Sequence, residues 1–150
     1  MEQLTLSSPA FADRGPVPAA YSHESGDVSP ALIWSGVPAA CLELVLVCED
    51  PDARGGTFVH WMLGDIPPEF DGLAAGQEGP RLARGRNGFG DLGYGGPHPP
   101  HGDPPHRYVF TLYALRRPSG LTSGFSRDDL RAALKDDVLA SAALVGTYAR

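Results

Sequence analysis

The sequence predicts a compact, loop-rich, mainly β fold, and three observations lead to that prediction. The 19 Gly and 15 Pro together make up about 23% of the 150 residues, against roughly 12% in average proteins, and both are poor residues for helix interiors. Apolar residues still form 42% of the chain, so a hydrophobic core is expected. The apolar segments are short and lie between Gly- and Pro-rich stretches, as is typical of β proteins. We expect residues 1–150 to form a single domain.

Five segments are predicted to be strands, because each is a short apolar or β-branched run between turn residues. They are Leu4–Leu6, Ala31–Trp34, Leu42–Cys48, Thr57–Leu63 and Arg107–Leu115. The last of them carries aromatic and β-branched residues at both odd and even positions. We therefore expect it to be a central strand with both faces covered.

One helix is predicted near the end of the chain. Ser126 is a candidate N-cap, and Asp129 three residues later completes an arrangement that resembles a capping box. The apolar residues that follow recur at helical spacing and predict a core-facing stripe. They are Leu130, Ala133, Leu134 and Val138.

About forty residues between Pro67 and Pro105 have little periodicity, and a loop of that length is often functional. Twelve of the Gly and Pro residues lie between Gly79 and Gly102. Within this stretch, Gly88–Gly93 matches the dinucleotide-binding pattern G-x-G-x-x-G. That pattern needs a preceding strand and a following helix, whereas a Gly- and Pro-rich segment follows here, so we reject the nucleotide interpretation and expect no cofactor.

Composition excludes several classes of protein. A net charge of −6 and the lack of a Lys/Arg run argue against nucleic acid as the partner. The longest apolar runs have about five residues, whereas a membrane-spanning helix needs about 20. No basic and apolar leader follows Met1, so we expect no signal peptide and a cytoplasmic location. Cys41 and Cys48 lie roughly 23 Å apart if the strand between them is extended, which is too far for a disulfide.

Three polar residues in or beside predicted strands are candidates for a binding site. Asp50 follows Leu42–Cys48 and shares its parity with Leu44 and Cys48, so it should project from the same sheet face. His60 lies in an otherwise apolar strand, where a lone His is most often a satisfied core residue. His106 opens the strand Arg107–Leu115.

Together these residues suggest a cleft for a small anion. Two imidazoles can donate N–H bonds to an anionic oxygen and become cationic below a pH of about 6.5. Gly95 and Gly96 would let backbone N–H groups turn inward and form an anion-binding concavity. Asp50 could orient one imidazole or accept from a ligand amine. The chemistry suits a phosphate-like or carboxylate ligand, or a phosphorylated amine.

Several motifs resemble the phosphatidylethanolamine-binding protein family, and in particular its compact bacterial and archaeal branch, often labelled Raf kinase inhibitor-like. The resemblance spans almost the whole chain, and the loop motif with its His-Arg-Tyr sequel is its most specific part. The motifs are Ser29–Trp34, Asp50–Ala53, His60–Trp61, Ile66–Pro67, Gly93–Gly102, His106–Tyr108 and Leu144–Arg150.

The resemblance implies a large antiparallel sheet packed with a smaller second sheet, plus one or two short helices near the C-terminus. It also implies an anion pocket with Asp50, His60 and His106 as its polar core. Three further residues, Gly96, His98 and Pro100, would form the loop wall of that pocket, with Ala53 near the mouth. Similar family members are described as binding or regulatory proteins, some of which inhibit kinases or proteases, and the bacterial branch implies a homodimer.

Two positions depart from the family pattern. Arg54 stands where the family usually has Pro, so it either adds a charged donor at the mouth or lies in solvent. Asp136-Asp137 replaces a Gly-His pair of this branch and is expected to alter the junction after the helix.

The leading hypothesis is a non-catalytic protein that binds a small phosphate-like anion or phosphorylated-amine head group and has a regulatory or inhibitory role. One alternative is a hydrolase-type enzyme, because Asp50 beside His60 and His106 also suits acid/base chemistry or a 2-His-1-carboxylate metal site. No short metal-ligand spacing and no G-x-S-x-G motif supports it, and we expect no metal. The other alternative is a protease or kinase inhibitor that acts through exposed loops.

Overall fold

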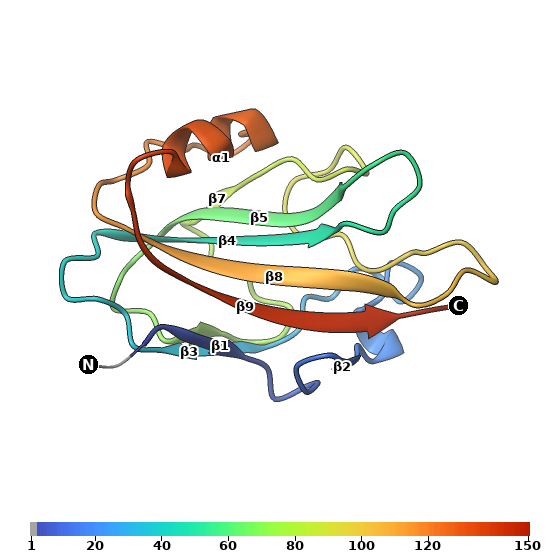
Figure 1. Ribbon diagram of the computed structural model, residues 1–150. Coiled ribbons are helices and arrows are strands. Elements are labelled where there is room, and N and C mark those ends of the chain that lie inside the picture. The colour runs from blue at the N-terminus through green and yellow to red at the C-terminus, as the bar shows by residue number, and fades with distance from the viewer. Residues whose placement is uncertain (1–2) are drawn as a thin grey trace.

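The computed structural model describes residues 3–150, which form two β-sheets and one α-helix (Figure 1). The large sheet has the strand order β2-β9-β8-β4-β5-β7, and the small sheet has the order β1-β3-β6. All strand pairs are antiparallel except β2 with β9. The elements are β1 (Thr5–Ser7), β2 (Gly15–Pro16), a 3₁₀ turn (Ala19–Tyr21), β3 (Leu32–Ser35), β4 (Glu43–Asp50), β5 (Phe58–Ile66), β6 (Gly72–Leu73), β7 (Ala83–Arg84), β8 (His106–Leu115), α1 (Arg127–Leu134) and β9 (Val138–Tyr148).

The predicted fold class is confirmed: a large sheet packs with a smaller one, and a single short helix precedes the last strand. Each of the five predicted strands is present, with bounds that differ by at most three residues. The predicted strand Arg107–Leu115 corresponds to β8, and its predicted central position is confirmed, because β8 lies between β9 and β4.

The sequence analysis missed β9. Val138, which was predicted to extend the helical stripe, is instead the first residue of this strand. The helix ends at Leu134, and Asp136-Asp137 form part of the turn that leads into β9. Ala and Ser residues dominate the first half of β9, and Ala is uncommon in strands. The strand is held by pairing with β8 along its length, from Leu115↔Val138 to His106↔Tyr148.

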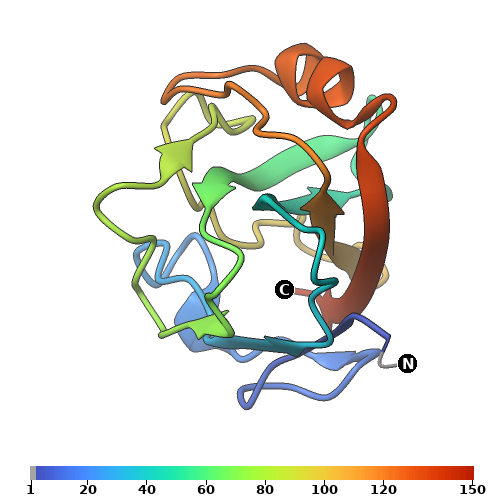
Figure 2. The same ribbon diagram turned by 90° about the vertical axis from the view of Figure 1, so that its left-hand side faces the viewer.

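Two hydrophobic clusters cover opposite faces of the large sheet. The inner cluster fills the space between the sheets and includes Trp34, Trp61 and Phe110. The outer cluster lies under α1 and includes Phe125 and Leu130. Figure 2 shows the small sheet and α1 at opposite sides of the large sheet.

The prediction that both faces of β8 are covered is therefore only partly correct. Its inward residues, such as Tyr108 and Leu112, are buried, and so is Leu115 on the outer face beneath α1. Further along the outer face, Val109 and Thr111 are half-buried and Arg107 is exposed. The helix is short, so it covers only one end of that face.

The long Gly- and Pro-rich segment is ordered by short-range bonds. It contains β6, β7 and an isolated bridge between Arg86 and Leu92. The Oδ1 of Asn87 accepts the amides of Phe89 and Asp91. The Gly88–Gly93 motif lies in turn and bend residues around the Arg86–Leu92 bridge, and no helix begins directly after it within the described residues.

Two smaller findings concern the cysteines and the membrane. Cys41 and Cys48 are both buried and free. Within residues 3–150, no helix has the length and apolar character needed to cross a bilayer.

The predicted capping box of α1 is present and gives a test of the helix junction. Ser126 Oγ accepts the amide of Asp129 at 3.1 Å, and Asp129 Oδ2 accepts the amide of Ser126 at 2.9 Å. We expect Ser126→Ala to lower the free energy of unfolding by about 1 kcal/mol, measured by urea denaturation. Ser7→Ala, at an exposed strand position without a side-chain bond of this kind, should change it by less. Equal effects of the two substitutions would contradict the role of the cap.

Candidate ligand-binding site

A cavity of about 220 Å³ lies where β4 ends and β5 and β8 begin. It contains five of the six predicted site residues, namely Asp50, His60, His98, Pro100 and His106, together with Ala53 from the predicted mouth. Gly96 does not line it. Its complete lining is Asp50, Ala53, Arg54, Phe58, His60, Phe89, His98, Pro99, Pro100 and His106.

Asp50 is the last residue of β4 and projects from the inner face, as its strand parity predicts. Its side chain is almost fully buried, with 3% of the residue exposed. Oδ1 accepts the amide of Asp52 at 2.7 Å, which closes the turn around Pro51. Oδ2 lies 2.7 Å from Nδ1 of His106. Both carboxylate oxygens are thus held by the protein, and Asp50 is a fixed part of the site.

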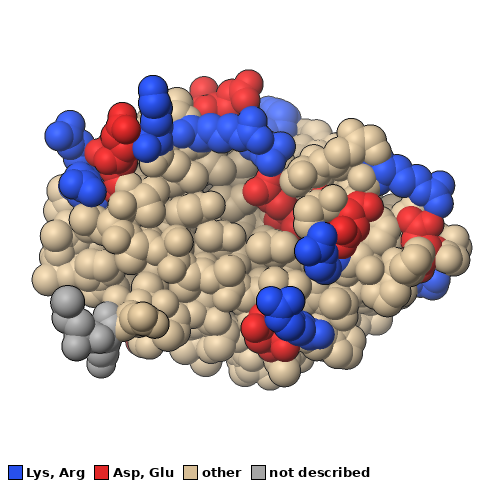
Figure 3. All heavy atoms as spheres, viewed as in Figure 1, with Lys and Arg blue, Asp and Glu red and all other residues tan. Residues whose placement is uncertain are grey.

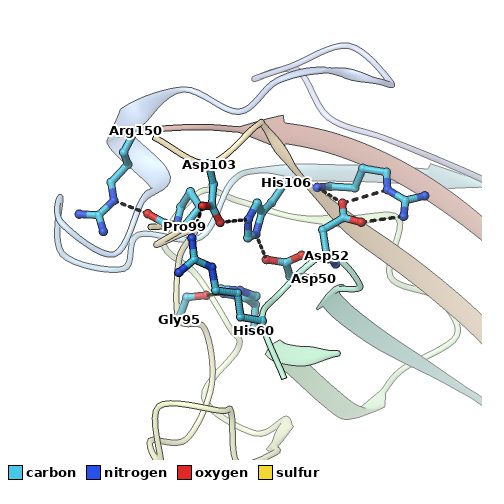
Figure 4. Close-up of polar contacts among 10 residues, drawn as sticks. Asp50, Asp52, His60, Gly95, Pro99, Asp103, His106 and Arg150 are labelled. Carbon is cyan, nitrogen blue, oxygen red and sulfur yellow. Dashed lines mark hydrogen bonds and ion pairs between the residues drawn. The ribbon is translucent and has the colours of Figure 1, made fainter. Parts of the chain in front are cut away.

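His106 is placed between two carboxylates (Figure 4). Its Nδ1 donates to Asp50, and its Nε2 donates to Asp103 Oδ2 at 3.0 Å. An ionised carboxylate accepts hydrogen bonds, so carboxylates at both ring nitrogens favour the imidazolium form of His106. Burial opposes this charge, but the hydrogen bonds to Asp50 and Asp103 outweigh it, and the pKa of His106 is raised above its ordinary value.

Arg54 closes this chain of charges at the cavity mouth. Its guanidinium donates to Asp103 Oδ1 at 2.6 Å, although 75% of the Arg54 side chain remains exposed. The hydrogen bonds from His106 and Arg54 hold the pKa of Asp103 below its ordinary value. Two positions were considered for Arg54, one at the cavity mouth and one in solvent. The residue lines the cavity, and most of its side chain lies in solvent.

A neighbouring ion pair lies outside the cavity. Asp52 accepts the backbone amide of Arg107 and two bonds from its guanidinium. These hydrogen bonds lower the pKa of Asp52 to about 2. The pair links the turn after β4 to the start of β8, next to Asp50 and His106.

His60 reaches the cavity through a β-bulge in β5. The register passes from Cys48↔Trp61 to Glu49↔Val59, so His60 is the extra residue on its strand. In an unbroken strand His60 would share the outer face with Met62, because side chains alternate. The bulge re-aims it toward the inner face, where its ring contacts Phe58 and Tyr108.

The hydrogen bonding of His60 makes it chemically different from His106. Its Nδ1 donates to the carbonyl of Gly95 at 2.7 Å. Burial lowers the pKa of His60 below its ordinary value, against the opposing effects of the Gly95 carbonyl and Asp50. The ring is therefore neutral at pH 7, and its Nε2, which has no protein partner within residues 3–150, is an acceptor. His60 is both a satisfied core residue and a cavity residue.

The predicted anion-binding concavity at Gly95 and Gly96 is not formed. The amide of Gly95 donates to the carbonyl of His60 at 2.8 Å, and that of Gly96 donates to Asp27 Oδ1 at 2.9 Å. A Cβ at Gly96 would overlap the backbone of Tyr21–His23. The glycine is thus required for close packing of two loops, and both amides already have partners inside the protein.

Phe58 and Phe89 form an aromatic wall that the sequence analysis did not identify. Their rings lie 4.9 Å apart in an edge-to-face arrangement, and the ring of His23 stacks on Phe89 at 4.2 Å. Phe89 stands at the tip of the turn ordered by Asn87. The sequence offers one indication of this wall, namely the aromatic Phe89 between Gly88 and Gly90 of the rejected nucleotide motif.

The opposite wall is held by the end of the chain. Arg150 donates to the carbonyl of Pro99 at 2.6 Å (Figure 4). It also forms an ion pair with Glu24. The neighbouring His98 is exposed, and its pKa is lowered by partial desolvation and by the charge of Arg150. Tyr108, two residues after His106, has a buried hydroxyl group with no hydrogen-bond partner within the described residues.

On the face shown in Figure 3, basic and acidic side chains are interspersed. One ion pair outside the cavity joins Arg127 and Glu49 at 2.8 Å. Within residues 3–150, no group of three or more His, Cys, Asp or Glu side chains is arranged to hold a metal ion.

Comparisons with known proteins agree with this fold. The chain is 41% identical to a UPF0098 protein of Methanothermobacter thermautotrophicus over 98% of this chain and 99% of the relative. The crystal structure of a phosphatidylethanolamine-binding protein homolog, CT736 of Chlamydia trachomatis, superposes with a TM-score of 0.92 at 34% identity, covering 100% of this chain and 99% of the other. Escherichia coli YbcL, described as a new member of the mammalian PEBP family, gives a TM-score of 0.92 at 29% identity, with 99% of each chain covered.

A family model decides the assignment. The model described as "Phosphatidylethanolamine-binding protein" matches residues 7–149 and so includes every residue of the cavity. The chain belongs to the phosphatidylethanolamine-binding protein family.

Proposed function

We propose that this protein binds a small phosphate-like anion or the head group of a phosphorylated amine in the cavity of Asp50, His60 and His106, and acts as a binding or regulatory protein. The observation that carries the proposal is the position of His106 at the cavity wall between Asp50 and Asp103, two carboxylates that raise its pKa and favour its cationic form. Arg54 adds a second cation at the mouth. A buried cation at the position of His106 attracts an anion more strongly than a cation on an open surface does.

The size and lining of the cavity support a small ligand. Its volume of about 220 Å³ is below the about 300–1,000 Å³ of sites that hold drug-sized molecules. Phe58, Phe89 and Pro99 add apolar lining beside the charged residues. A head group with one charged end and a short carbon segment fits a cavity that has both charged and apolar lining.

His60 favours a ligand that also donates a hydrogen bond. As a neutral ring whose Nδ1 proton is used by Gly95, it offers a lone pair on Nε2. An ammonium or hydroxyl group of the ligand could donate to it. A phosphorylated amine combines that donor with an anionic group for the cationic side.

The hydrolase alternative has less support. Both ring nitrogens of His106 are bound to carboxylates, so the ring offers no lone pair for general-base chemistry. The ten residues that line the cavity include no Ser, Thr, Cys or Lys that could act as a nucleophile. A protein target such as a protease or kinase and a homodimer stay predictions from the family resemblance, and a cytoplasmic location stays a prediction from the sequence.

A titration with phosphorylethanolamine tests the proposal. We expect the ring signals of His60 and His106, followed by NMR, to move at millimolar ligand. His106→Gln should weaken binding by about tenfold or more, because a charge-assisted bond is worth about 1.5–3 kcal/mol. His101→Gln is the matched control, since His101 is exposed and does not line the cavity. Ring signals that stay unmoved in the wild-type protein would refute the proposal.

The affinity should also depend on pH in a defined direction. The cationic form of His106 attracts the anion, so binding is strongest below the pKa of His106 and weakens as pH rises through it; that pKa is raised by Asp50 and Asp103 above its ordinary value. Sulfate is the suitable probe, because its charge is constant between about pH 5 and 9, where imidazoles titrate. Affinity measured by calorimetry should fall only above the ordinary pKa of about 6.5. A pH-independent affinity would contradict the assignment of His106 as the charged group.

A further inference from the structure

Asp103 is the feature of this site that simple anion binding leaves unexplained. Its carboxylate accepts from Nε2 of His106 and from the guanidinium of Arg54. These are the two cationic donors that an anionic ligand would need. Asp103 was not identified by the sequence analysis, and it lies in the loop segment between Gly102 and Pro104.

The charges of the cavity cancel while this arrangement holds. Asp50 and Asp103 carry negative charge, and His106 and Arg54 carry positive charge. The group as a whole is neutral, so an approaching anion meets no net attraction. An anion gains affinity only if it takes the place of one of the carboxylates.

We propose, building on the proposed function, that Asp103 is the specificity-determining residue of the cavity: its carboxylate occupies the anion position on His106 and Arg54, and a ligand binds by displacing it. The ligand oxygen then accepts from Nε2 of His106, and Arg54 bonds to the ligand in place of Asp103. Asp50 stays on Nδ1 and keeps the ring oriented.

The surroundings of the two carboxylates favour displacement of Asp103 over Asp50. Asp50 is held by the amide of Asp52 as well as by His106, and its side chain is 4% exposed. The side chain of Asp103 is 14% exposed, and its partner Arg54 is 75% exposed and free to follow a ligand. Rotation of the Asp103 side chain would release both cations without moving its backbone, whose amide donates to the Pro100 carbonyl at 3.3 Å.

The loop around Asp103 keeps the carboxylate near the site. Gly102, with a φ of 86°, makes the turn before it, and Pro104-Pro105 stiffens the chain after it. A tethered group of this kind acts at a millimolar effective concentration or above. A free monocarboxylate offers the same chemistry without the tether, so it competes poorly. A dianion such as a phosphate monoester or sulfate interacts more strongly with two cations, so the site should select dianions.

Substitution of Asp103 tests this inference with two probes, inorganic sulfate and acetate. The measurements are made at a pH of about 5.5, where His106 is protonated with either residue at position 103. Asp103→Asn removes the competing charge and keeps the shape of the side chain. We expect it to tighten sulfate binding by about tenfold to a hundredfold, the worth of a charge-assisted bond. Acetate, without effect on the wild-type protein, should become a measurable ligand.

Asp52→Asn is the matched control. It makes the same change of net charge close by, but Asp52 pairs with Arg107 outside the cavity. The Asn side chain keeps the shape of Asp52 and can still accept a hydrogen bond from Arg107, so sulfate affinity should change by about twofold or less. Arg54→Gln, which removes a cation that transfers to the ligand, should weaken sulfate binding.

The outcomes separate this inference from the proposed function. Equal sulfate affinity in wild-type protein and Asp103→Asn, with His60 and His106 signals that respond in both, would overturn the displacement and leave anion binding intact. Weaker binding in Asp103→Asn and in a second variant, Asp103→Ala, would show that Asp103 supports the site rather than competing for it. No response in wild-type protein or either variant would overturn both proposals.

Discussion

The buried imidazolium of His106 is the interaction on which the rest of the site depends. A cation at a position with 5% exposure needs anionic partners, because an uncompensated buried charge costs several kcal/mol. Asp50 comes from the end of β4 and Asp103 from the loop before β8, so one ring ties two strands and a loop together. Asp52 and Arg107 repeat the connection on the solvent side. The geometry of the cavity follows from where these charges can meet.

The walls of the cavity are set by contacts between distant parts of the chain. Asp27 holds both His23 and the amide of Gly96, which brings the segment before β3 against the Gly-rich loop. Arg150 fixes Pro99 from the end of the chain. The loop is ordered without regular secondary structure because its backbone groups find partners of this kind. The concentration of Gly permits the close approaches, and the Pro residues limit the alternatives.

The value of sequence patterns differed from residue to residue. Strand parity placed Asp50 on the inner face correctly, because β4 pairs with β8 without a register shift from Glu43 to Glu49. Strand parity could not predict the face on which His60 lies, because a β-bulge shifts the alternation of side chains at this residue. The bulge arises from the pairing of β4 with β5, which the sequence of β5 alone does not reveal. The orientation of the Gly95 and Gly96 amides was wrong for a similar reason: their partners, His60 and Asp27, lie far away in the sequence. Asp103 gave no local signal, and β9 was missed because pairing with β8 outweighs the low strand preference of its Ala residues.

The bulge in β5 has an evolutionary consequence. His60 lies on the inner face because β5 has one extra residue between Trp61 and Val59, which pair with consecutive residues of β4. The face is therefore set by the length of the strand rather than by the chemistry of any one side chain. A single-residue deletion in β5 would therefore be selected against more strongly than most replacements at the same positions. When distant relatives are aligned, matching the histidines will require the strand length between the paired positions to be preserved as well as the residue itself.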